Sequence, residues 1–277
     1  MTILFVGRST FDLGYVCANY PEEDAKHSAT HFWAGAGGCA LNAAVTARAL
    51  GSEVKLLTLL GTGPFADAVR TELAQYDVPF EDFATDTEVL PVSSIIVVPG
   101  NASRTIVDQQ PPQALKCEPD IDALLAEATL VLTDGWLPAL VIPLCRGARE
   151  QGIPVVLDGG SVKPWSAELM PLIDYAVVSN RFQPEFSFEV HHHYHFAMTR
   201  GAGPISWYDG YGGGSITPPQ VEAVDTLGAG DVFHGAFCHY LAKWPDFPDA
   251  LEKAAVVAAE SCRHYGARAW IGSFGVD

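Results

Sequence analysis

Short apolar runs alternate with segments of helical spacing along most of this 277-residue chain. The runs are bounded by turn residues, as buried strands are, and between them apolar positions recur every three or four residues, as on one face of a helix. This alternation indicates an α/β fold with a mostly parallel sheet and helices on both faces. The predicted strands are Ile3–Val6, Val54–Leu60, Leu130–Thr133, Pro154–Leu157, Tyr175–Ser179 and Phe196–Thr199, and the predicted helices are Ala40–Leu50, Ala66–Tyr76, Ile121–Glu127, Pro138–Gln151 and Ala250–Cys262.

Two regions break this rhythm. Val92–Val98 and Ser103–Val107 flank Pro99–Ala102, which predicts a hairpin with its turn. Asp12–Cys17 and Ala29–Trp33 are predicted to form two more extended pieces. The length of the chain and its hydrophobic share of 48% allow one sizeable core, so we expect a single domain over residues 1–277.

Charge and hydropathy exclude several classes of partner. No apolar run reaches the ~18 residues that a membrane span needs, and the N-terminus lacks the basic lead of a signal peptide. A net charge of −17 would repel a nucleic acid, although a nucleotide could still be held by a local group of amides. Six cysteines are scattered without a C-x-x-C pair, which favours reduced thiols and a cytoplasmic location.

Four histidines cluster within residues 191–195. Clustered imidazoles can bind zinc or nickel. Adjacent side chains of an extended segment point to opposite faces, however, and no cysteine accompanies these histidines. We therefore interpret the cluster as a polar surface connection, with a metal site as the alternative.

One glycine-rich stretch carries most of the chemistry. Gly228, Ala229 and Gly230 stand directly before a segment of helical spacing, Val232–Leu241. Their amides can converge on one point at a helix N-terminus, where unpaired N–H groups and the helix dipole attract an anion. Asp231 adds a carboxylate, which suits a reaction in which a substrate hydroxyl attacks a phosphoryl group. The alternative is a loop that only packs a helix against a sheet.

Two motifs carry a family resemblance. The stretch Asp225–Asp231 has the sequence D-T-L-G-A-G-D and resembles the C-terminal signature of the ribokinase-like (PfkB) family of ATP-dependent sugar and small-molecule kinases. The stretch Gly37–Asn42 has the pattern G-G-x-x-x-N, which is similar to that family's N-terminal motif. The resemblance implies a ribokinase-like α/β domain with a small β lid from about residues 12–34 and 91–108. It also implies ATP and Mg²⁺ as cofactors, a monovalent-cation loop and a homodimer formed through the lid.

Residues Gly35–Ala40 also have the pattern G-x-G-x-x-A of a dinucleotide-binding loop. The residues before them, His31–Trp33, form a poor strand pattern, and no acidic residue closes a second strand about 20 positions on. A sugar site is therefore the favoured interpretation of the glycines. A structural loop and a dinucleotide site remain the alternatives.

The resemblance assigns the substrate side. It implies that the backbone of Gly37 and Gly38, together with Asp12 and Asn42, contacts sugar hydroxyls, with a turn cap as the alternative role of Asp12. Residues 101–106 are similar to the lid stretch of ketohexokinases, which implies a ketohexose-like substrate and a phosphate contact for Arg104. The alternative for Arg104 is a solvated charge on the hairpin.

The resemblance also assigns the nucleotide side. It implies nucleotide contacts for Asn180, Thr199, Gly201, Cys262 and Gly266, the last beside the monovalent-cation loop. Three departures from the family pattern accompany these residues. The motif N-x-x-E ends in Gln183, the segment Gly61–Ala66 lacks the usual G-x-D-x-x-G, and Gly203 comes one residue early for T-x-G-x-x-G.

These observations predict an ATP-dependent kinase for a sugar or sugar-like alcohol, with Asp231 as the catalytic carboxylate. Acceptors other than a ketohexose, such as a nucleoside or a sugar phosphate, stay open. The altered N-x-x-E motif keeps a non-catalytic sugar or nucleotide sensor as the main alternative. An oxidoreductase using Gly35–Ala40 would leave Asp225–Asp231 without a role.

Overall fold

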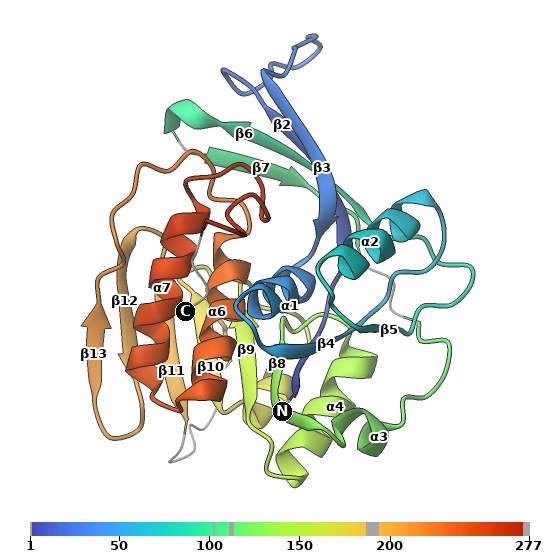
Figure 1. Ribbon diagram of the computed structural model, residues 1–277, viewed down its shortest axis with the longest axis vertical. Coiled ribbons are helices and arrows are strands. Elements are labelled where there is room, and N and C mark those ends of the chain that lie inside the picture. Colours follow the sequence, from blue (N-terminus) through green and yellow to red (C-terminus); the bar gives the residue numbers. More distant parts are fainter. Residues whose placement is uncertain (1, 102, 111–113, 187–193, 274–277) are drawn as a thin grey trace.

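The computed structural model describes residues 2–101, 103–110, 114–186 and 194–273. Its centre is a nine-stranded sheet in the order β13-β12-β11-β10-β9-β8-β1-β4-β5 (Figure 1). All neighbouring strands are parallel except β11–β12 and β12–β13, which are antiparallel. The strands are β1 (Thr2–Val6), β4 (Glu53–Thr58), β5 (Phe80–Asp82), β8 (Ala128–Thr133), β9 (Val155–Gly159), β10 (Tyr175–Ser179), β11 (His195–Arg200), β12 (Gly203–Tyr208) and β13 (Gly213–Ile216).

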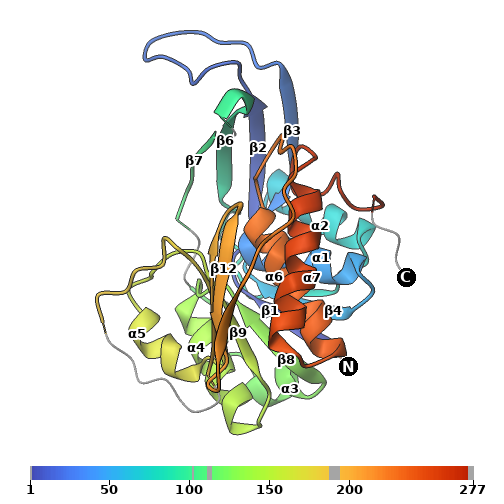
Figure 2. The same cartoon turned by 90° about the vertical axis from the view of Figure 1, so that its left-hand side faces the viewer.

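Helices cover both faces of this sheet (Figure 2). Strand β1 shows the reason, because Ile3 and Phe5 belong to one core cluster while Leu4 and Val6 belong to the other. Successive strand residues point to opposite faces, so a continuous apolar run needs cover on each side. One face is covered by α1 (Cys39–Ala49), α2 (Pro64–Gln75), α6 (Ala229–Lys243) and α7 (Phe247–Ser261), and the other by α3 (Ile121–Leu125), α4 (Pro138–Glu150) and α5 (Ser166–Leu169).

A second sheet of four strands projects from the carboxyl edge of the first (Figures 1 and 2). Its order is β3-β2-β6-β7, with β2 and β6 parallel and the other two pairs antiparallel. We call this sheet the lid. Its strands are β2 (Thr10–Val16), β3 (His31–Gly37), β6 (Val92–Val98) and β7 (Ser103–Val107).

The predicted fold class is confirmed, and most predicted elements lie within two or three residues of the observed ones. The second extended piece, predicted over Ala29–Trp33, is a strand but ends four residues later than expected, at Gly37. Strand β3 continues through Gly37 because its whole length pairs with β2, from His31 opposite Val16 to Gly37 opposite Thr10. Strand β5 and helix α5 had not been predicted. Within the described residues no helix is both long and apolar enough to cross a membrane, and the histidines at 191–193 lie outside those residues.

Candidate active site

A cavity of about 470 Å³ lies where the carboxyl ends of β9, β10 and β11 meet the first turn of α6 and the last turn of α7. The carboxyl edge of a parallel sheet is where α/β proteins bind ligands. Nine residues predicted for catalysis or binding line it, namely Arg104, Asn180, Thr199, Gly201, Gly228, Ala229, Gly230, Asp231 and Cys262. Five others do not line it, namely Asp12, Gly37, Gly38, Asn42 and Gly266.

The first turn of α6 forms the floor of the predicted anion site. Gly228 precedes the helix with φ +69°, a left-handed conformation that favours glycine. The Ala229 amide is directed at Thr226 O at 3.3 Å, whereas no hydrogen bond found in the described part of the chain uses the amides of Gly228, Gly230 or Asp231. A Cβ atom at Gly230 would meet nothing within 4 Å. Free amides and open space at a helix N-terminus suit a bound anion.

Asp231 lies at this turn, and its side chain is half-buried. Asn42 donates its side-chain amide to Asp231 Oδ2 at 2.6 Å. Burial and the negative charge of Asp158 raise the pKa of Asp231 to about 6, against the opposing effects of Asn42 and His234. Asn42, predicted to bind sugar, thus contacts the carboxylate predicted to be catalytic, and the two residues are 189 positions apart in the sequence.

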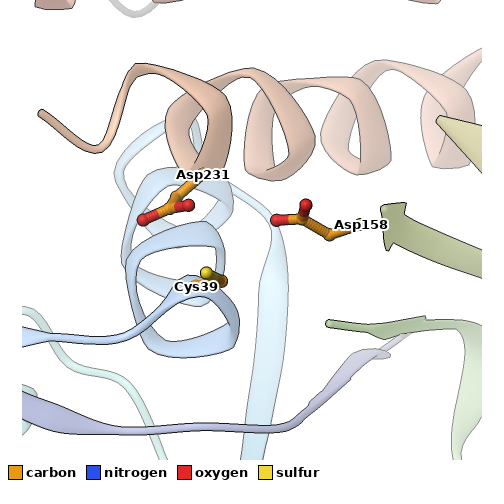
Figure 3. A group of neighbouring side chains, drawn as sticks. All are labelled: Cys39, Asp158 and Asp231. Carbon is orange, nitrogen blue, oxygen red and sulfur yellow. The ribbon is translucent and has the colours of Figure 1, made fainter. Parts of the chain in front are cut away.

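Cys39 and Asp158 complete a cluster with Asp231 that sequence reasoning had missed. Figure 3 shows the three side chains arriving from α1, β9 and α6, with the two carboxylates facing each other. One ligand atom from each lies within 4.8 Å of the others. The signal available in the sequence was a lone carboxylate near the end of an apolar strand, Asp158 before Gly159.

His234, one turn further along α6, lies next to this cluster and approaches Asp158. Its Nδ1 lies 2.7 Å from Gly230 O and 3.3 Å from Asp158 Oδ2, and its Nε2 lies 2.9 Å from Val177 O. Both ring nitrogens therefore face oxygen atoms of the protein. His234 lowers the pKa of Asp158 and of Asp231, against the effect of their burial.

Asp12 belongs to the lid and is also buried. Thr10 Oγ1 donates to Asp12 Oδ1 at 2.7 Å. Burial is the main cause that raises the pKa of Asp12 to about 6, and Asp231 adds to it through its charge. A Cβ atom at Gly37 would lie 2.1 Å from Asp12 Oδ2, and one at Gly38 would lie 2.3 Å from the backbone of Arg8. The two glycines thus make room for protein atoms around Asp12.

Two cations that share a contact with Trp136 were also missed by sequence reasoning. Arg8 pairs with Asp108 and donates to Gln109 O at 2.8 Å. Lys163 is buried and donates to the carbonyl and hydroxyl oxygens of Ser161. Both cations contact Trp136, with Arg8 Cζ 5.3 Å and Lys163 Nζ 4.7 Å from the ring centre.

Asp225 organises the loop before α6. Its two carboxylate oxygens accept the amides of Leu227 and Gly266 at 2.9 Å each. The Cys262 carbonyl accepts the amides of Val224 and Asp225 at 2.9 and 3.2 Å. These bonds connect the end of α7 to the glycine-rich turn. They also hold Gly266 at Asp225, outside the set of residues that line the cavity.

Arg104 connects the lid to the same loop. It comes from β7, lines the cavity and donates to Thr226 Oγ1 at 2.7 Å. The charged Arg104 side chain on the lid hairpin therefore lies at the cavity and bonds to the loop before α6.

Comparison with known proteins agrees with this geometry. The model of the pfkB family carbohydrate kinases matches residues 2–181 and 185–271. A deoxyribokinase of Salmonella typhi is 28% identical over 94% of this chain and 92% of its own, and a ribokinase of Lactococcus lactis is 24% identical over 84% and 81%.

Solved structures show the same fold. A putative ribokinase from Agrobacterium tumefaciens has a TM-score of 0.84 at 25% identity, covering 98% of this chain and 94% of its own. Arabidopsis thaliana ribokinase, solved with ribose and ATP, has a TM-score of 0.75 at 20% identity, covering 98% and 94%. The chain therefore belongs to the pfkB family of carbohydrate kinases and is an ATP-dependent sugar kinase.

Proposed function

We propose that this kinase transfers the γ-phosphoryl group of ATP to a hydroxyl of a ribose-like sugar, with Asp231 as the catalytic carboxylate. The observation that carries the proposal is the position of Asp231, which lines the cavity beside the free amides of Gly228 and Gly230. A hydroxyl held by Asp231 could attack a phosphoryl group whose oxygens accept those amides. With a pKa of about 6, Asp231 is ionised at neutral pH and can take up the hydroxyl proton.

Mg²⁺ bound with ATP would neutralise charge on the β- and γ-phosphates. Asp158 fits it, because carboxylate oxygens suit Mg²⁺ and the buried Asp158 Oδ2 accepts no hydrogen bond within the described residues. The loop around Gly266 is the proposed place of a monovalent cation, and activity that depends on K⁺ would support it. Free cysteines and the use of ATP fit a cytoplasmic location.

The choice of a ribose-like acceptor rests on the relatives, which are named ribokinases and deoxyribokinases. The ketohexose expected from the lid stretch around Arg104 is the alternative acceptor. A coupled assay of ADP release with ribose, deoxyribose and fructose tests the choice. Turnover with a pentose at the highest kcat/KM supports it, and a clear preference for fructose would overturn it.

The alternative of a non-catalytic sensor, which Gln183 at the place of the usual glutamate had favoured, is not supported, because the chain belongs to a family of carbohydrate kinases. Gln183 is exposed and donates to Asn180 O at 3.2 Å, next to the residues that line the cavity.

We also propose a homodimer formed through the lid. The registers of the lid strands place Phe32 opposite Tyr15, and Tyr15 opposite Ile96. Phe32 is 53% and Tyr15 36% exposed, so three neighbouring strands share an apolar outer face. A second copy of the same face is the simplest cover for it.

A further inference from the structure

Cys39, Asp158 and Asp231 form a donor set that the phosphoryl-transfer reaction does not require in full. The three side chains come from three elements that are distant in sequence, and all of them line the cavity (Figure 3). One sulfur and two carboxylate oxygens lie within 4.8 Å of one another. These three side chains carry no positive charge. They would therefore repel the polyphosphate of ATP unless a cation were bound between them.

The donor atoms have free capacity. The Asp158 side chain is 7% exposed, yet its Oδ2 accepts no hydrogen bond among the described residues. His234 Nδ1 is 3.3 Å away, but its closer acceptor is Gly230 O at 2.7 Å. Asp231 accepts a hydrogen bond from Asn42 at Oδ2 and another from the Cys39 thiol, and that thiol gives up its proton when a metal binds. A buried carboxylate oxygen that accepts no hydrogen bond is costly, and a cation between Asp158 and Asp231 would relieve their mutual repulsion.

The sulfur determines which cation fits. Mg²⁺ takes oxygen ligands, whereas zinc and cobalt accept thiolate together with carboxylate. Zinc binds sulfur at about 2.3 Å and carboxylate oxygen at about 2.0–2.2 Å, so the donors have to draw together by about 1 Å from the 4.8 Å that bounds the group. Side-chain rotation supplies such a movement, and water completes a fourth ligand position.

We propose that Cys39, Asp158 and Asp231 bind a zinc-class divalent cation, and that this cation inhibits the kinase by occupying the catalytic carboxylate. The Cys39 thiol loses its proton to solvent when the metal–sulfur bond forms, and no electron is transferred. Binding is therefore tighter at higher pH. Two carboxylates and a thiolate carry three negative charges, of which the ion neutralises two.

Binding is tested without ATP or sugar, so the result does not depend on the proposed function. Co²⁺ is titrated into the metal-free protein, and the thiolate-to-cobalt charge-transfer absorption is recorded. We expect a band that saturates at one ion per chain and that Zn²⁺ abolishes. The band reports a thiolate, so ions bound by the histidines of segment 191–195 do not contribute to it.

Two variants identify the ligand. Cys39→Ser should abolish the band and weaken Zn²⁺ by roughly tenfold or more, since even loss of a supporting group beyond the ligands costs that much. Cys117→Ser, which removes an exposed thiol, is the matched control and should leave both unchanged. Absence of a band in the wild type, or an equal band in Cys39→Ser, would overturn the site.

Inhibition is tested separately, with free Zn²⁺ set by a metal buffer because ATP itself binds zinc. Each variant is compared with its own activity in Mg²⁺ alone. We expect half-inhibition of Cys39→Ser to need roughly tenfold more free Zn²⁺ than the wild type. Equal sensitivity of the two would overturn the inhibitory role. If instead no sugar is phosphorylated at all, the proposed function fails while the cobalt result still decides the site.

Discussion

Asp231 combines burial with a defined hydrogen bond, and both properties bear on catalysis. We expect Asp231→Asn to lower kcat by about 10²–10⁴-fold, because the variant cannot accept the hydroxyl proton and holds the hydroxyl less well. ATP affinity should change little, since the amides of Gly228 and Gly230 remain. A coupled ADP assay and calorimetry measure the two quantities. Asp86→Asn, at an exposed position, is the control, and near-normal turnover of Asp231→Asn would contradict the mechanism.

Asn42 provides a test through pH. Its amide stabilises the ionised form of Asp231, whose pKa is about 6, so activity should fall as the pH drops below about 6. Asn42→Ala removes that bond and raises the pKa, so the acidic limb of the pH–rate profile should move to higher pH. Loss of a hydrogen bond to a charged group is worth about 1.5–3 kcal/mol, which corresponds to about 1–2 pH units.

The readout separates this role from the one first expected for Asn42. If Asn42 only contacted sugar, its loss would raise the KM for sugar and would leave the acidic limb of the pH profile of kcat at the same pH. An unshifted limb with a raised KM for sugar would therefore show that Asn42 binds the acceptor and does not tune Asp231.

At the scale of elements, a substitution in the first turn of α6 should affect the stability of the helix and the binding of ATP in opposite directions. A Cβ atom at Gly230 would enter open space in the cavity. Gly230→Ala should therefore stabilise the helix by about 0.5–1 kcal/mol, while its methyl group occupies space meant for phosphate and lowers kcat/KM for ATP. Thermal unfolding and steady-state kinetics measure the pair of effects.

Gly235, one turn later in the same helix, is the matched comparison. A Cβ atom there would lie 2.3 Å from Ala43 O, where α6 packs on α1. Gly235→Ala should lower the melting temperature. If Gly230→Ala lowered it as well, or left ATP kinetics unaffected, the open space at the start of α6 would not be a phosphate site.

At the scale of the whole molecule, the apolar outer face of the lid predicts that two copies of the chain form a dimer. The purified chain of 29.7 kDa should have about twice that mass by light scattering at micromolar concentration. Ile96→Lys places a charge in the centre of the apolar outer face, next to Tyr15, and should yield monomers. Tyr211 lies in the turn between β12 and β13 and is 87% exposed, so Tyr211→Lys should leave the dimer intact. A single species of monomer mass in the wild type would contradict the dimer.

Periodicity and local motifs determined much of this protein. Strand Tyr175–Ser179 and the lid pair Val92–Val98 and Ser103–Val107 were predicted with their observed bounds, because apolar alternation and turn residues act within a few positions. The motif around Asp231 indicated the reaction class for a similar reason, since a helix start and its free amides are local features.

The tertiary structure alone decided which side chains meet. Asp158, Cys39 and Lys163 gave no strong signal, because each is a single residue whose significance depends on neighbours that belong to other elements of the fold. Asn42, predicted to contact sugar, donates to Asp231 as well, and this contact arises because α1 and α6 pack side by side only after the parallel sheet has formed. Parallel pairing brings the carboxyl ends of distant strands to one edge, and no local pattern encodes which residues then face each other.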